Sequence, residues 1–131
     1  MRVPELAPAA TALAEAELAG RPADRFLLAH LAALRVAAVV LACRMPQRRA
    51  GRASTGPRDA WQVLAEVAPE YAEWAGFFAA SALKRQAVAA GAVAVVNARE
   101  ADDLVRDAGL FHDQVAARLA RVRPAPRREA S

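Results

Sequence analysis

The stretch Ala23–Cys43, ADRFLLAHLAALRVAAVVLAC, is the longest apolar run in the chain, and the expected fold follows from it. If the stretch is helical, one sector of the helix carries core-type side chains, namely Phe26, His30, Ala33, Leu34, Ala37 and Leu41. The rest of its surface is also poor in charge, with Asp24, Arg25 and Arg35 as the exceptions. A helix that is apolar on nearly every side is typical of the centre of a helical bundle.

A membrane-spanning helix is the competing interpretation of this stretch, because its length and apolarity also suit a bilayer. Arg35 lies near the middle, where a charge costs about 2.5–3.5 kcal/mol on insertion scales, and His30 adds to that cost. The rest of the chain supplies amphipathic segments that match a central helix. We therefore expect a buried helix and no contact with a membrane.

Length and composition indicate one domain in a reducing compartment. The 131 residues suffice for a single core. Cys43 is the only cysteine, which excludes an intramolecular disulfide, and its place at the end of the apolar helix predicts a packed thiol. Glu5, Glu15 and Glu17 interrupt the amino-terminal residues where a secretory signal would be continuously apolar, so we expect a cytoplasmic protein.

Four further helices are expected around the central one. Ala9–Ala19 is a short helix whose main apolar contacts would be Leu13 and Leu18. Residues 59–67 form another, anchored by Trp61 and Leu64, and residues 70–90 a longer one that begins after Pro69. A last helix starts at Asn97, because Glu100 three residues later completes a capping box.

The segments between and after these helices complete the expected architecture. Residues 91–96, GAVAVV, predict an extended connector packed on the bundle, since a lone strand would have no partner. Residues 1–123 would then form one domain, and residues 124–131 a disordered tail. The predicted fold is an all-α, antiparallel bundle of four to five helices.

A basic loop is predicted over residues 44–58, RMPQRRAGRASTGPR, which contains no acidic residue. Its arginines are Arg44, Arg48, Arg49, Arg52 and Arg58. The loop is a candidate phosphate-binding arm, and a solvated linker is the simpler alternative. The whole chain has a net charge of +4 and a pI near 10.5, which permits a polyanionic partner but does not require one.

Two aromatic residues in the helix over residues 70–90 suggest a protein contact. On its polar side, Phe77 interrupts a stripe of Glu70, Glu73, Ser81 and Lys84. Single exposed aromatic residues are common on proteins. Because Trp74 is its neighbour on this helix, we interpret Phe77 with Trp74 as a self-association contact.

Three segments together resemble the small stand-alone HEPN proteins of high-GC bacteria. They are RFLLAHLAALRVAAVVLA at 25–42, APEYAEWAGFFAA at 68–80 and AREADDLVRDA at 98–108. The resemblance covers roughly residues 10–120 and implies an antiparallel helical bundle that is cytosolic and often dimeric. It also implies a superfamily with RNA-cleaving toxins and defence effectors as well as many non-catalytic members, so a toxin–antitoxin or defence setting is one expectation.

Ribonucleases of the HEPN superfamily carry an arginine followed, after four to six residues, by a histidine on a late helix. Arg106 and His112 match that spacing on the last helix, and Arg25 and His30 match it on the central one. A histidine can move the proton of a ribose 2′-hydroxyl and an arginine can stabilise charge on the phosphate, without a metal.

Two observations favour a structural role for both pairs. In so arginine-rich a chain, such a spacing arises readily by chance. On a helix, Arg106 and His112 would point about 120° apart, and Arg25 and His30 about 140° apart. Both histidines fall on or beside the buried sector of their helix, as expected for core residues with a hydrogen-bond partner.

No other chemistry is indicated. Two histidines and one cysteine offer no metal-ligand spacing, and no glycine-rich phosphate loop follows a strand, so we expect no metal and no cofactor. The sequence favours a non-catalytic domain that binds RNA, a nucleotide or a protein partner, including a second copy. A metal-independent ribonuclease that uses Arg106 and His112 is the first alternative. A purely structural protein–protein interaction module is the second.

Overall fold

The computed structural model describes residues 3–45 and 57–122, and these residues form helices without any strand. In chain order the elements are η1 (Pro4–Leu6), α1 (Ala7–Leu18), α2 (Pro22–Arg44), α4 (Pro57–Val67), η2 (Pro69–Tyr71), α5 (Ala72–Ala89), η3 (Val93–Val95) and α6 (Ala98–Val122). The predicted all-α, antiparallel bundle is confirmed. The predicted tail and most of the basic loop lie outside the described residues.

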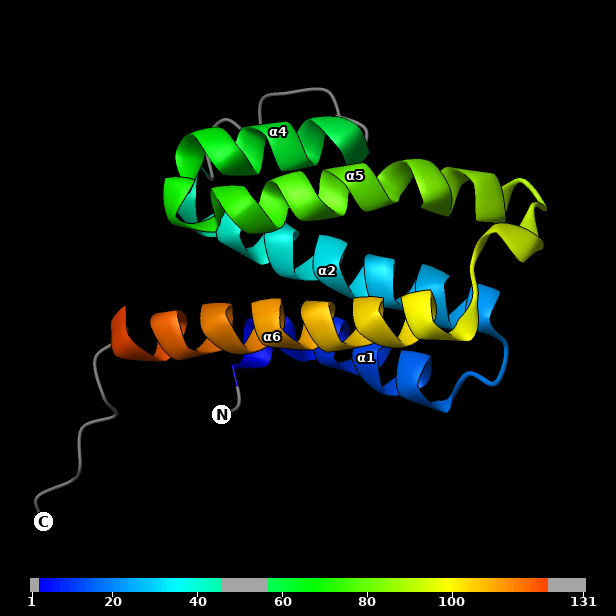
Figure 1. Ribbon diagram of the computed structural model, residues 1–131. Coiled ribbons are helices and arrows are strands. Elements are labelled where there is room, and N and C mark those ends of the chain that lie inside the picture. Colours follow the sequence, from blue (N-terminus) through cyan, green and yellow to red (C-terminus); the bar gives the residue numbers. More distant parts are fainter. Residues whose placement is uncertain (1–2, 46–56, 123–131) are drawn as a thin grey trace, which may run out of the picture.

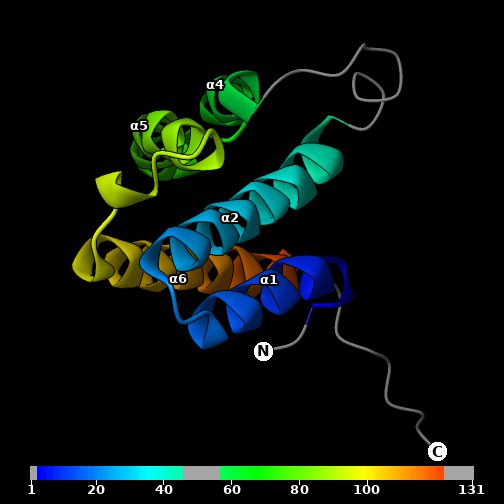
Figure 2. The ribbon, with the colours of Figure 1, turned by 90° about the vertical axis from the view of Figure 1, so that its right-hand side faces the viewer.

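The helix α2 lies at the centre of the bundle, as predicted, and packs against the other four α-helices. Figures 1 and 2 show α1 and α6 together on one side of it and the α4–α5 hairpin on another. By length and composition alone α2 would also suit a membrane span. In the folded chain its large apolar side chains and its single histidine contribute to the core, with Phe26, His30, Val36 and Val40 buried.

The contact between α1 and α2 differs from the prediction in one respect. Leu18, expected to be a main apolar contact of α1, is 85% exposed, whereas the alanine face of Ala9, Ala12 and Ala16 is fully buried. Small side chains let two helix backbones approach closely, and the core in this region is completed by Leu6 and Val3 from the preceding residues. The prediction was wrong for Leu18, whereas Leu13 packs against the core as expected.

Two further local predictions are corrected. Cys43, predicted to be a packed thiol, is exposed in the last turn of α2. The segment 91–96 is not extended but turns through Gly91, which adopts a φ of 110°, into the 3-10 helix η3. Only Val96 of this connector is buried, so Val93 and Val95 face solvent.

The start of α6 follows the predicted capping box. The backbone N–H of Glu100 donates to Asn97 Oδ1 at 2.8 Å, and the N–H of Asn97 donates to Glu100 Oε1 at 3.1 Å. The same carboxylate forms an ion pair with Lys84 of α5, which lowers the pKa of Glu100, as do the hydrogen bonds of the box. This group therefore links the beginning of α6 to the far end of α5.

Candidate functional site

The helices α5 and α6 face each other without packing backbone to backbone, because aromatic rings fill the space between them. Phe111 of α6 has its ring centre 5.5 Å from that of Phe78 and 5.8 Å from that of Trp74. Tyr71 meets Phe111 edge-on at 5.7 Å. Phe78 and Phe111 are fully buried, so the rings act as a spacer that holds the two helices apart.

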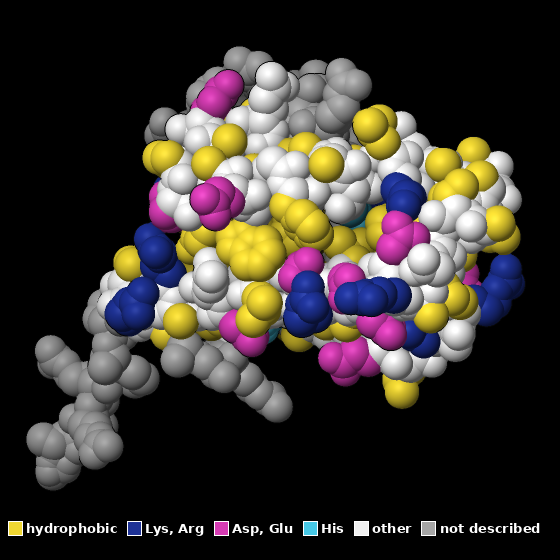
Figure 3. Space-filling model, in the orientation of Figure 1, with side chains coloured by type: hydrophobic (Ala, Val, Ile, Leu, Met, Phe, Trp, Pro, Cys, Tyr) yellow, Lys and Arg dark blue, Asp and Glu magenta, His cyan; other side chains and the backbone are white. Residues whose placement is uncertain are grey.

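An open groove of about 670 Å³ lies over this spacer. It is lined by Pro69, Glu70, Ala72, Glu73, Trp74, Phe77, Asp107 and Gln114. Figure 3 shows the apolar side chains as a band between α5 and α6, bordered by charged residues. The ionisable side chains of described residues that line the groove are the acids Glu70, Glu73 and Asp107, of which Glu70 and Asp107 form ion pairs with arginines beside it.

Phe77 and Trp74 lie in this groove, on the side of α5 where the sequence placed them. Phe77 is 41% exposed, and its ring meets that of Trp74 edge-on at 6.5 Å. Trp74 stacks on Phe78 and donates its indole N–H to Gln114 Oε1 at 3.0 Å. The hydrogen bond spans the groove from α5 to α6 and fixes the orientation of the indole ring.

Glu70, at one end of the groove, is held by two arginines. Arg44 forms an ion pair with it and also donates to Val67 O at 3.2 Å. Arg118 lies 3.5 Å from Glu70 Oε2 and stacks over the ring of Tyr71. Hydrogen bonding from Arg44 is the main cause that lowers the pKa of Glu70.

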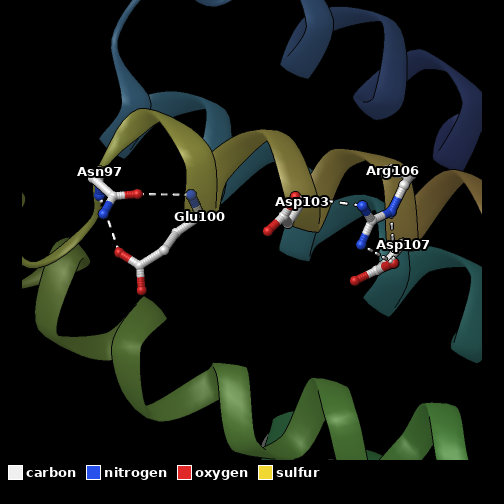
Figure 4. Close-up of polar contacts among 5 residues, drawn as sticks. All are labelled: Asn97, Glu100, Asp103, Arg106 and Asp107. Carbon is white, nitrogen blue, oxygen red and sulfur yellow. Dashed lines mark hydrogen bonds and ion pairs between the residues drawn. The ribbon is translucent and has the colours of Figure 1, made fainter.

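The predicted catalytic pair on α6 is divided between two surfaces. The guanidinium of Arg106 contacts Asp107 at 3.1 Å and Asp103 at 3.4 Å, next to the groove (Figure 4). The ring of His112 contacts Asp113 Oδ1 at 3.0 Å and lines another hollow, formed with η1 and α1. Among the described residues, no hydrogen bond or ion pair joins Arg106 to His112.

The lesser pair, Arg25 and His30, has structural partners. Arg25 donates two hydrogen bonds to Ala19 O, at 3.0 and 3.2 Å, and pairs with Asp102 of α6, so it fastens the turn between α1 and α2. His30 is fully buried, and its Nε2 lies 3.0 Å from Phe78 O. The prediction that His30 is a core histidine with a hydrogen-bond partner is confirmed.

The predicted basic loop is shorter than the sequence suggested. Arg44 belongs to the last turn of α2, where Glu70 occupies it, and Arg58 belongs to the first turn of α4. Arg48, Arg49 and Arg52 lie outside the described residues, as does the side chain of Arg58. Arg44 is therefore the one candidate phosphate ligand of the five whose side chain the structure describes, and that side chain forms an ion pair.

Sequence reasoning did not find the α6 side of the groove. Asp107 and Gln114 of α6 both line it. Gln114, which bonds Trp74, is 40 residues beyond Trp74 in the sequence. No local pattern links these positions to α5. Within the described ranges, no cluster of three or more histidine, cysteine, aspartate or glutamate side chains has the arrangement of a metal site.

Comparison with known proteins gives one match. The model of a protein family described as SAV_6107-like HEPN matches residues 16–116, which is more than half of the chain. No curated protein and no solved structure matches. The matched range runs from the end of α1 to the middle of α6 and therefore includes both sides of the groove.

Proposed function

The chain belongs to the SAV_6107-like HEPN family, and we propose that it is a non-catalytic helical domain that binds a protein partner, a second copy of itself. The observation that carries the proposal is the groove between α5 and α6, which is lined by the exposed Phe77 and the partly buried Trp74. Exposed aromatic side chains on a rigid support are typical of the energetic centre of protein interfaces.

The charges of the groove favour a protein over RNA at this surface. Among the described residues, the ionisable side chains that line it are Glu70, Glu73 and Asp107; Glu70 and Asp107 are paired with arginines, which leaves Glu73 as the carboxylate that a phosphate backbone would meet. Nucleic-acid binding depends on arginine and lysine contacts to phosphates. The arginines nearest the groove, Arg44, Arg106 and Arg118, are already paired with carboxylates of the same chain.

Self-association through Phe77 is tested by sedimentation equilibrium of the full-length protein. We expect Phe77→Ala to weaken the dimer about tenfold or more, because truncating a central interface aromatic costs about 1.4–2 kcal/mol. Leu18→Ala is the matched control, since Leu18 is a large exposed apolar residue far from the groove. A wild-type chain that stays monomeric at high concentration, or equal dimerisation of all three proteins, would show that the proposal is wrong.

A second candidate function is a metal-independent ribonuclease that uses Arg106 and His112. The observation that favours it is the contact of His112 Nδ1 with Asp113, because a carboxylate at one ring nitrogen leaves the other, Nε2, free to act as a base. Asp107 and Asp103 similarly fix the guanidinium of Arg106. The two groups lie on different sides of α6, so both could act on one RNA only if two copies contribute to the site.

The ribonuclease candidate is tested with labelled single-stranded RNA in EDTA. If it is correct, the wild-type chain cleaves and both His112→Ala and Arg106→Ala lose cleavage while they remain folded. If the non-catalytic proposal is correct, none of the three proteins cleaves. Either role is compatible with a cytoplasmic toxin–antitoxin or defence setting, which we keep as an expectation from the superfamily.

A further inference from the structure

Two similar acid–aromatic pairs follow each other in the chain, the first in η2 and the second at the beginning of α5. The sequence EYAEWA contains Glu70 with Tyr71 and, one turn later, Glu73 with Trp74. Residues three apart on a helix are neighbours on its surface. Both acids and Trp74 line the groove, whereas Tyr71 is buried, so only the two carboxylates lie at successive positions along it.

The first of these pairs already holds an arginine. The guanidinium carbon of Arg118 lies 5.5 Å from the ring centre of Tyr71, and its Nη1 lies 3.5 Å from Glu70 Oε2. A guanidinium over an aromatic face, with a carboxylate beside it, gains both a cation–π contact and an ion pair. The pair of Glu70 and Tyr71 thus binds a guanidinium group within the chain itself.

The second pair holds no such cation from the part of the chain that the structure describes. Glu73 is exposed and has no hydrogen bond or ion pair with any described residue. The α6 residue one turn before Arg118 is Gln114, which bonds the indole N–H of Trp74 but brings no charge. Arg106, the nearest arginine on the opposite side, is held by Asp103 and Asp107. Among the described residues, the groove therefore presents an unpaired carboxylate beside a partly buried indole.

We propose that Glu73 and Trp74, with Phe77 beside them, form a subsite for the guanidinium of an arginine that a second copy of the chain inserts into the groove. The subsite rests on the proposed self-association through the groove, and it names the side-chain contact by which the second copy would bind. The charges are complementary, because the subsite is acidic while 17 of the 18 basic residues of the chain are arginines. The planar guanidinium stacks on an indole, which an ammonium group does not do as well.

The first test compares dimerisation of full-length Glu73→Gln and Glu66→Gln by sedimentation equilibrium. Glu66 is an exposed glutamate on α4 and gives the matched control for the loss of one negative charge. We expect Glu73→Gln to weaken the dimer about two- to fivefold, as for an exposed cation–π and ion-pair contact, and Glu66→Gln to leave it unchanged. Raising NaCl from about 50 to about 500 mM should weaken the wild-type dimer but affect the Glu73→Gln dimer less.

The second test uses a small probe and tryptophan fluorescence. An acetylated, amidated peptide with two arginines should change the emission of the wild-type protein and dissociate its dimer. Its citrulline counterpart, which has the same shape without the charge, should do neither. Trp74→Phe should abolish the fluorescence response, because Trp61 is buried in the core, and Glu73→Gln should reduce it.

The outcomes separate this inference from the proposed function. If Phe77→Ala weakens the dimer but Glu73→Gln behaves like Glu66→Gln, the groove is an interface and the arginine subsite is wrong. Equal effects of the arginine and citrulline peptides would also overturn the subsite. A chain that never self-associates would overturn both the function and the assigned occupant. If single-stranded RNA changes the fluorescence of Trp74 equally in the wild type and in Glu73→Gln, the groove binds a nucleic acid and the arginine subsite is wrong.

Discussion

At the scale of single residues, His30 illustrates how burial changes a titratable side chain. Its ring meets the stacked rings of Trp61 and Phe78 edge-on, with ring centres 6.0 and 6.3 Å away. With Phe78 O accepting from Nε2, the neutral ring carries its proton on that nitrogen, and Nδ1 has no partner among the described residues. Burial therefore lowers the pKa of His30, against a smaller opposing effect of the hydrogen bond to Phe78.

The lowered pKa predicts a pH dependence of stability. Below a pH of about 6.5 the unfolded chain binds a proton at His30 that the folded chain does not. The free energy of unfolding should therefore be fully retained above that pH and should fall as the pH decreases towards the pKa of folded His30. Urea unfolding at several pH values between neutral and mildly acidic measures this decrease in the free energy of unfolding.

His30→Leu is the matching variant for this measurement. It removes the titrating ring. The free energy of unfolding of the wild type minus that of the variant should therefore decrease as the solution is acidified. The carboxylates contribute equally to both proteins and cancel in the difference. A constant difference between wild type and variant across this range would refute the assignment to His30.

At the scale of elements, the capping box of α6 predicts a local stability effect. Asn97→Ala removes the side-chain acceptor for the N–H of Glu100, and loss of such a cap costs about 1 kcal/mol. The free energy of unfolding from urea titration should fall by that amount. Arg99→Ala, an exposed substitution in the same first turn, should have little effect. Equal destabilisation by both variants would mean that the cap does not contribute.

At the scale of the whole molecule, Phe111 joins helices that are distant in the sequence. Its ring contacts those of Trp61, Tyr71, Trp74 and Phe78, which come from α4, η2 and α5. The distance between α5 and α6, and with it the width of the groove, depends on this fully buried ring. A change at Phe111 should therefore affect the entire fold.

Phe111→Ala is expected to destabilise the protein by about 3–5 kcal/mol, as for other large-to-small core substitutions. Leu110→Ala, next to it but about half exposed at 48%, should cost far less. Urea unfolding followed both by circular dichroism and by tryptophan fluorescence tests the effect. If the two probes give separate transitions for the wild type, the helices do not unfold as one unit and the expected global effect is wrong.

The sequence by itself determined the properties that repeat along one helix. The apolar character of residues 23–43, the capping box at Asn97 and the exposure of Phe77 each follow from neighbours within one or two turns, and each was predicted correctly. The family was also predicted, because the helix order and three local segments are visible in the sequence. Helical periodicity is a local property, so one sequence suffices to detect it.

Only the tertiary structure decided which helix surfaces meet. It separated α5 from α6 by a layer of rings, paired Arg44 with Glu70, and left Glu73 beside Trp74 without a partner among the described residues. It also buried the alanines of α1 in place of Leu18. These outcomes depend on how side chains from distant elements fit together at interior packing density, and no spacing within a single helix encodes that fit.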